Sequence, residues 1–145
     1  MTNDPSGTPL GGPPRLPLTV YIADDSAPIA EMLTELLTAP GRVEVIGVGD
    51  SAAGAIEDII RLAPDAVVLD MQLKTGSGAD VIRAVRAKGK LARTRLIVVS
   101  NHTSAQLKAG CLELGADDYF DKVKELALLT QRIGELAARK EREGL

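Results

Sequence analysis

The sequence predicts an α/β protein in which five helices wrap both faces of a doubly wound, five-stranded parallel sheet. Five short apolar runs alternate with longer segments whose apolar residues recur at helical spacing. The run Ala66-Val67-Val68-Leu69 has no polar interruption, which is typical of a strand buried on both faces of a parallel sheet. Strands that alternate with helices are joined by crossover connections, so the strands run parallel. Such connections are right-handed in nearly all known cases.

The predicted strands are short and rich in Val, Ile and Leu. They are Leu18–Ala23, Val43–Gly49, Ala66–Asp70, Arg95–Ser100 and a short strand within 118–122. The predicted helices begin or end at recognisable signals, such as the N-cap residue Ser26, the helix breaker Pro64 and the helix-terminating Gly115. They run from Ser26 to residue 39, between Ser51 and Pro64, and over 79–88, 104–114 and 123–142.

Composition limits the class of protein. The chain has 145 residues, 45% hydrophobic and 26% charged, as expected for one globular domain. A net charge of −3 argues against a nucleic-acid surface, and no apolar run approaches the length of a membrane span. The single cysteine, Cys111, excludes an internal disulfide and suits a reducing cytoplasm. Residues 1–17 are rich in Pro and Gly, so we expect a flexible tail before a domain over 18–143.

Polar side chains gather where the predicted strands end. The first strand ends at Asp24 and Asp25, the third at Asp70, the fourth at Ser100 and the fifth at Lys122. Ligands of open α/β sheets bind beyond the carboxyl ends of the strands. Three carboxylates together repel one another unless cations lie among them, and Lys122 and Mg²⁺ are suitable cations. The pattern predicts a metal-assisted phosphoryl site with Asp70 as the nucleophile.

With these residues in this order, the chain from about Leu18 to Arg142 resembles a response-regulator receiver domain of bacterial two-component signalling. The resemblance implies a flavodoxin-like, CheY-like fold with strand order 2-1-3-4-5. It implies that Mg²⁺ is held by Asp24, Asp25, Asp70 and the main-chain carbonyl of Gln72.

The remaining functional residues are also implied by the resemblance. Asp70 matches the phosphoacceptor, Ser100 the hydroxyl residue that senses the phosphoryl group, and Lys122 the invariant lysine. Tyr119 matches the aromatic residue whose rotation reports activation, and Gly78 matches a loop glycine. Ser100 and Tyr119 would together form the switch.

The resemblance implies that a sensor histidine kinase or a histidine phosphotransfer protein phosphorylates Asp70 in the presence of Mg²⁺. Partner binding would then switch on the face made by the fourth helix, fifth strand and last helix, and a phosphorylation-dependent homodimer fits the same scheme. It implies no enzyme activity beyond the chain's own phosphotransfer and autodephosphorylation. We expect a stand-alone receiver rather than an excised module, because the sequence starts at Met1 and only Gly144 and Leu145 lie beyond the last predicted helix and its flanking Glu143.

Two departures from the family pattern concern loops. Val123 follows the lysine where the family usually has a cis-proline, and we expect a trans bond because a cis non-prolyl bond costs ~3 kcal/mol. Lys74 stands where a proline is common.

Three other functions are compatible with an α/β fold of this kind. A flavin- or nucleotide-binding protein would have a G-x-G-x-x-G after a strand, and this chain has none. An aspartyl-phosphate hydrolase usually has Asp-x-Asp on its first strand, and this chain does not. A receiver that no longer turns over phosphate, and acts only in dimerisation or docking, is the main alternative.

Overall fold

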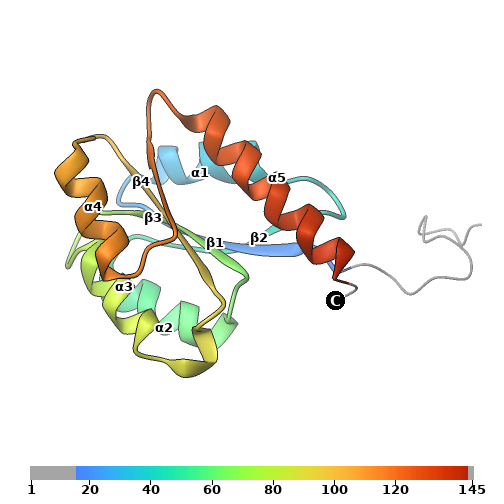
Figure 1. The fold of residues 1–145 in the computed structure, drawn as a ribbon, viewed down its shortest axis with the longest axis horizontal. Helices are drawn as coiled ribbons and strands as arrows, with labels where there is room; N and C mark the ends of the chain where they lie inside the picture. Colours follow the sequence, from blue (N-terminus) through green and yellow to red (C-terminus); the bar gives the residue numbers. More distant parts are fainter. Residues whose placement is uncertain (1–15, 144–145) are drawn as a thin grey trace, which may run out of the picture.

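The computed structural model describes residues 16–143, which form one five-stranded sheet with helices on both faces (Figure 1). The strands are β1 (Leu18–Ala23), β2 (Val43–Gly49), β3 (Ala66–Asp70), β4 (Arg95–Ser100) and β5 (Asp118–Asp121). The helices are α1 (Ala27–Leu37), α2 (Ala52–Leu62), α3 (Gly78–Arg86), α4 (Ala105–Leu114) and α5 (Leu126–Arg142). All neighbouring strands are parallel and their order is β2-β1-β3-β4-β5. The predicted fold class and strand order are therefore confirmed.

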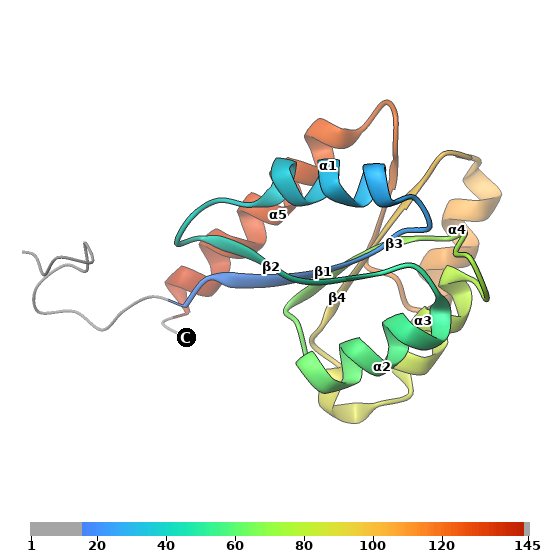
Figure 2. The same ribbon diagram turned by 180° about the vertical axis from the view of Figure 1, so that it is seen from behind.

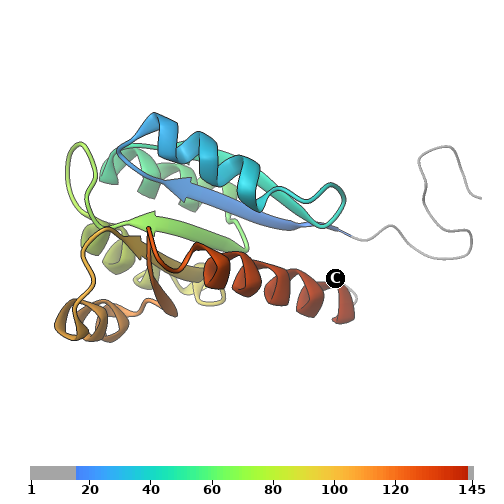
Figure 3. The ribbon, with the colours of Figure 1, turned by 90° about the horizontal axis from the view of Figure 1, so that it is seen from above.

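The helices form two layers. In Figure 2, α1 and α5 cover one face of the sheet, and α2 and α3 cover the other. Figure 3 shows α1 and α5 side by side on their common face, while α4 lies toward the β5 end of the sheet. This is the doubly wound arrangement that right-handed crossovers produce.

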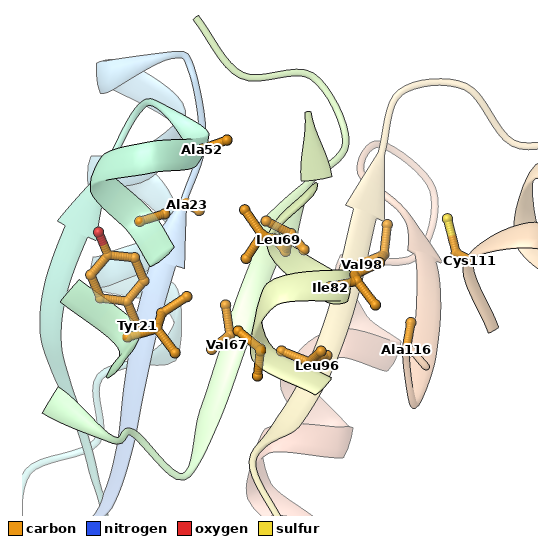
Figure 4. Close-up of a cluster of buried hydrophobic side chains, with 14 of the residues drawn as sticks. Tyr21, Ala23, Ala52, Val67, Leu69, Ile82, Leu96, Val98, Cys111 and Ala116 are labelled. Atoms are coloured by element: carbon orange, nitrogen blue, oxygen red, sulfur yellow. The ribbon is translucent and has the colours of Figure 1, made fainter. Parts of the chain in front are cut away.

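Strand side chains alternate between two hydrophobic clusters, one on each face of the sheet. On β1, Tyr21 and Ala23 belong to the cluster beneath α2 and α3, whereas Val20 and Ile22 belong to the cluster beneath α1 and α5. Figure 4 shows the first cluster, with the side chains of the strands packed against Ile82 of α3. The central strand β3 is buried along its whole length, as its uninterrupted apolar run predicts.

Tyr21 links β1, β2 and α2. Its ring is fully buried, and its hydroxyl donates a hydrogen bond of 2.7 Å to Asp58 Oδ2. The ring fits because β2 has glycines beside it: a Cβ on Gly47 would lie 2.9 Å from the ring carbon Cδ1. The β1–β2 register shifts between Val20 and Tyr21, so that Ile46 has no partner on β1.

Two helix ends differ from the sequence prediction. Helix α1 ends at Leu37 rather than near residue 39, because the chain is already extended at Thr38 and turns at Pro40-Gly41. Helix α3 ends at Arg86 and is followed by a separate 3₁₀ turn at Gly89–Leu91.

The largest difference is at α5, which begins at Leu126 instead of residue 123. The N–H groups of Val123 and Lys124 bind the side chain of Asp121, so these residues form a turn before the helix. All peptide bonds among the described residues are trans, as expected for Lys122–Val123.

No helix within residues 16–143 is long and apolar enough to cross a membrane. Of the tail predicted over residues 1–17, all but Leu16 and Pro17 lies outside the described residues.

Candidate functional site

Four of the predicted site residues are brought together at the carboxyl edge of the sheet. Asp24 follows β1, Asp70 and Ser100 end β3 and β4, and Lys122 follows β5. All four are buried, with exposed fractions of 1% for Asp24 and 6% for each of the others. Burying an ionisable group costs free energy unless the group is paired, so Asp24, Asp70 and Lys122 need partners within the site.

Lys122 pairs with two carboxylates at once. Its Nζ donates hydrogen bonds of 2.8 Å to Asp24 Oδ2 and 2.8 Å to Asp70 Oδ2. Burial alone would lower the pKa of Lys122, but the bonds to the two aspartates outweigh it and the pKa is raised. Burial raises the pKa of Asp70 although Lys122 and the Gln72 N–H act in the opposite direction. The lysine is thus the internal cation of this site.

A third carboxylate completes an acidic cluster. Oxygen atoms of Asp24, Asp25 and Asp70 lie within 4.8 Å of one another. Asp24 uses one oxygen for Lys122 and the other for the Ser26 N–H at 2.9 Å. The Asp25 side chain is exposed and has no hydrogen-bonding partner among residues 16–143. Clustered carboxylate oxygens are the hard donors that Mg²⁺ prefers, so these residues fit the ion.

A hollow of about 230 Å³ opens beside this cluster. Asp24 and Asp25 line it together with Asp50 and Lys74. Lys74 Nζ lies 3.1 Å from Asp50 Oδ2, which keeps the ammonium at the rim of the hollow. Through this hollow the exposed carboxylate of Asp25 is open to solvent, at the edge of the acidic cluster.

The loop after β3 is held close to Asp70. The Gln72 N–H donates to Asp70 Oδ1 at 3.0 Å, while the predicted role of the Gln72 carbonyl as a metal ligand stays a prediction. Gly78 begins α3 directly against this loop, and a Cβ there would lie 2.8 Å from the Asp70 carbonyl oxygen. Only glycine permits this approach.

The two predicted switch residues meet at one main-chain carbonyl. Ser100 Oγ and the Tyr119 hydroxyl both donate to the carbonyl oxygen of His102, at 3.1 Å and 2.5 Å. The His102 N–H also donates to Ser100 Oγ at 3.1 Å. Tyr119 is only 3% exposed, so its ring points inward. The sequence analysis did not identify the His102 carbonyl, because a main-chain acceptor has no side-chain signature.

Comparison with known proteins shows the family of the chain. The sequence model of the family "Response regulator receiver domain" matches residues 20–134. A protein-glutamate methylesterase/protein-glutamine glutaminase of Koribacter versatilis (strain Ellin345) is 35% identical over 116 residues. The matched region is 79% of this chain but 31% of that protein, so the chain spans about a third of the curated relatives' length.

Two solved structures illustrate the structural match. The signal receiver domain of the response regulator NarL from Mycobacterium tuberculosis is 28% identical, with a TM-score of 0.75 over 84% of this chain and 97% of that one. CheY from Borrelia burgdorferi, solved with CheX, BeF₃ and Mg²⁺, has a TM-score of 0.75 over 83% of this chain and 90% of that one, and its 24% identity shows the fold alone. This chain belongs to the response-regulator receiver domain family of two-component signalling.

Proposed function

We propose that this receiver accepts a phosphoryl group on Asp70 from the phosphohistidine of a sensor histidine kinase or a phosphotransfer protein. The observation that carries the proposal is Lys122 Nζ, which lies 2.8 Å from both Asp24 and Asp70 at the edge of an acidic cluster. Receiver domains bind Mg²⁺ at such a pocket and interact with kinases or phosphotransfer proteins. We place the reaction in the cytoplasm, where such partners have their phosphohistidines.

The proposed chemistry is a phosphoryl transfer. A carboxylate oxygen of Asp70 attacks phosphorus as the nitrogen–phosphorus bond breaks, and the bonding electrons return to the imidazole. Mg²⁺, held by Asp24, Asp25, Asp70 and the Gln72 carbonyl, would neutralise charge on the phosphoryl oxygens. Lys122 is already beside Asp70, so its ammonium balances the added negative charge without being brought in from solvent.

The proposed output is a change on the face formed by α4, β5 and α5. Ser100 Oγ now binds the His102 carbonyl, and it must leave that carbonyl to reach phosphoryl oxygens on Asp70. The same carbonyl holds Tyr119, so phosphorylation would redistribute the hydrogen bonds that hold Tyr119 and the β4–α4 loop. Exposed Leu107 and Leu112 of α4 offer apolar contact to a protein partner.

Mass spectrometry tests the chemical step. With Mg²⁺ and acetyl phosphate or a phosphorylated kinase, the protein should gain the mass of one phosphoryl group. Asp70→Asn should abolish the gain, because an amide is not a nucleophile of this kind. Glu113→Gln, which changes an exposed acid on α4 in the same way, is the matched control and should be phosphorylated normally. Equal phosphorylation of Asp70→Asn would refute the assignment.

A second candidate is a receiver used only for docking, without phosphate turnover. One observation favours it: Tyr119 is already buried and hydrogen-bonded to the His102 carbonyl. The inward position of this ring therefore does not require phosphorylation. The two functions differ in one measurement. A switch binds its partner more tightly when Asp70 carries beryllofluoride, by roughly 5- to 150-fold for typical coupling. A docking module binds the partner equally in both states.

A further inference from the structure

Asp121, which the sequence analysis did not single out, is the centre of the turn beside Lys122. Its Oδ1 accepts the N–H groups of Val123 at 2.8 Å and Lys124 at 2.7 Å. Its Oδ2 accepts a hydrogen bond of 2.7 Å from the hydroxyl of Thr103, which lies in the β4–α4 loop. One carboxylate therefore receives three hydrogen bonds from two loops, and these are charge-assisted and correspondingly strong.

The turn fixes the main chain on both sides of Lys122. The Lys122 N–H donates to the Ser100 carbonyl at 2.8 Å, and the next N–H, that of Val123, is bound by Asp121. With both flanking peptide units held, the backbone dihedral angles of Lys122 are set, and with them the direction of its Cα–Cβ bond and its allowed rotamers. From that starting point the side chain extends to Asp24 and Asp70, where Nζ makes its two hydrogen bonds.

The start of α5 reinforces the same turn. The Asp121 N–H donates to Glu125 Oε1 at 2.8 Å, and the Glu125 N–H donates to the Asp121 carbonyl at 3.0 Å. Val123 itself is 76% exposed, so its side chain contributes little, and its N–H is the group that matters. A proline at this position would have no N–H for Asp121 to accept.

We propose that Asp121 is a positioning residue for Lys122: its carboxylate holds the trans Lys122–Val123 turn and thereby aims the ammonium at Asp70. The proposal rests on the proposed function, since it assumes that Lys122 assists phosphoryl transfer. Hydrogen bonds from Lys124, Thr103 and Val123 keep the pKa of Asp121 below its usual range, so the acceptor stays ionised at neutral pH. The effect acts through geometry, because none of the hydrogen bonds of the Asp121 carboxylate reaches Asp24 or Asp70.

A graded series of variants tests the proposal. Asn and Ser at position 121 retain an oxygen that can accept the Val123 N–H, Ser more weakly, whereas Ala has none. Two quantities are measured for each: the initial rate of phosphorylation by acetyl phosphate with Mg²⁺, and the hydrogen-exchange protection of the Val123 and Lys124 amides. Asp121→Ala should lose the protection and react about tenfold to a hundredfold more slowly, as expected when a reacting group is misplaced by about 1 Å. Asp121→Asn keeps a neutral acceptor and should lie nearer to the wild type than to Ala, and Asp121→Ser should fall between Asn and Ala.

Two control variants test other possible causes of a slower reaction, namely the loss of one negative charge and the loss of the bond between the two loops. Glu113→Ala removes one exposed negative charge from α4 and should change neither quantity. Thr103→Val removes only the bond between the loops and should leave the rate near that of the wild type.

Each alternative outcome is decisive. A normal rate in Asp121→Ala with its amide protection lost would overturn the proposal, and so would an Asn variant as slow as Ala, since the charge would then matter and not the turn. A Thr103→Val variant as slow as Asp121→Ala would transfer the role to the bond between loops. If Asp121→Ala does not fold, the Asn and Ser variants still rank the rates. A wild type that never accepts phosphate would refute the proposed function, whereas the amide protection would still report on the turn.

Discussion

Helices α3 and α4 are neighbours of similar length, and both begin with a serine N-cap, Ser77 and Ser104. They differ in how they meet the rest of the protein. Helix α3 buries four residues, including Val81, Ile82 and Val85, whereas Cys111 is the buried residue of α4. Capping and length alone therefore do not decide how firmly a helix is held, since most helical stability in proteins comes from packing of an apolar face.

The difference matters because α4 borders the proposed output face. Residues 105–110 are exposed throughout, so moving this part of α4 uncovers little apolar surface. Elements with few buried contacts open at low free energy, and moving elements are drawn from them. The C-terminal end of α4 is better held, because Arg86 Nε of α3 donates to the Gly115 carbonyl at 2.9 Å. We expect α3 to behave as a fixed support and α4 as the element that moves.

The largest expected effect comes from weakening the fixed support. Ile82→Ala removes a fully buried side chain and should lower the free energy of unfolding by about 2–5 kcal/mol. Leu107→Ala on α4, where the side chain is 49% exposed, should change it by no more than about 0.5 kcal/mol. Urea denaturation measures both. Similar losses for the two variants would show that α4 is packed as firmly as α3.

A smaller effect is expected at the junction of the two helices. Gly115 has a φ of +122°, and a Cβ there would lie 2.8 Å from Arg86 Cγ. Gly115→Ala should therefore lower the free energy of unfolding by about 1–3 kcal/mol, the usual cost of a strained backbone position. Urea denaturation of Gly115→Ala beside the wild type measures it, and an unchanged midpoint would mean that the junction does not hold α4.

A pH-dependent effect is expected on the α2 and α3 side of the sheet. Burial, together with the bond to Asp58, raises the pKa of Tyr21 well above its usual value. The unfolded chain therefore loses this proton near pH 10 while the folded protein keeps it. Stability is fully present below that pH and falls as the pH rises above it, by at most about 1.4 kcal/mol per pH unit.

The variant Tyr119→Phe leaves Tyr21 as its single tyrosine, because the chain has 2. Its phenolate absorbance should appear only at pH values well above that of a free tyrosine, or on unfolding. Phenolate absorbance at the ordinary pH in a folded sample would contradict the burial of this ring.

The smallest expected effect is a gain. Gly110 lies inside α4, and a Cβ added there would meet no atom of a neighbouring element within 4 Å, so Gly110→Ala should favour the helix by about 0.5–1 kcal/mol. Cys111 can report the result, because its thiol is free and buried and should react with a disulfide reagent only when α4 opens. The reaction should be slower in Gly110→Ala than in the wild type. Equal rates would indicate that the thiol is reached without opening of the helix.

Four of the strands were predictable to the residue because each is a short, mainly apolar run, whereas the fifth was predicted only as a short strand within 118–122 and spans Asp118–Asp121. The strand order came from the family resemblance, since periodicity does not reveal which strands are neighbours. The start of α5 was predicted wrongly for a physical reason: the side chain of Asp121 binds the N–H groups of Val123 and Lys124, and an apolar pattern gives no sign of such a bond. Local side-chain to main-chain bonds compete with the helix at such positions.

The site, like the fold, was predictable in part from the sequence. The rule that polar strand ends converge predicted that Asp24, Asp70 and Lys122 would lie together, and the structure places them within hydrogen-bonding distance. Their chemical roles remain predictions. Sequence patterns could not reveal that the Asp24 oxygens are both in use while Asp25 is free of partners among the described residues, because this depends on side-chain orientation.

The two outer strands of the sheet have a consequence for self-association. The edge strand β2 is interrupted where the register shifts opposite Tyr21, and the other edge, β5, has only 4 residues. Bulged or very short edges are poor templates for strand addition by another chain. The protein is thus protected against edge-to-edge aggregation even though its central strands are strongly apolar. Any pairing of two copies should therefore use helix surfaces rather than strand edges.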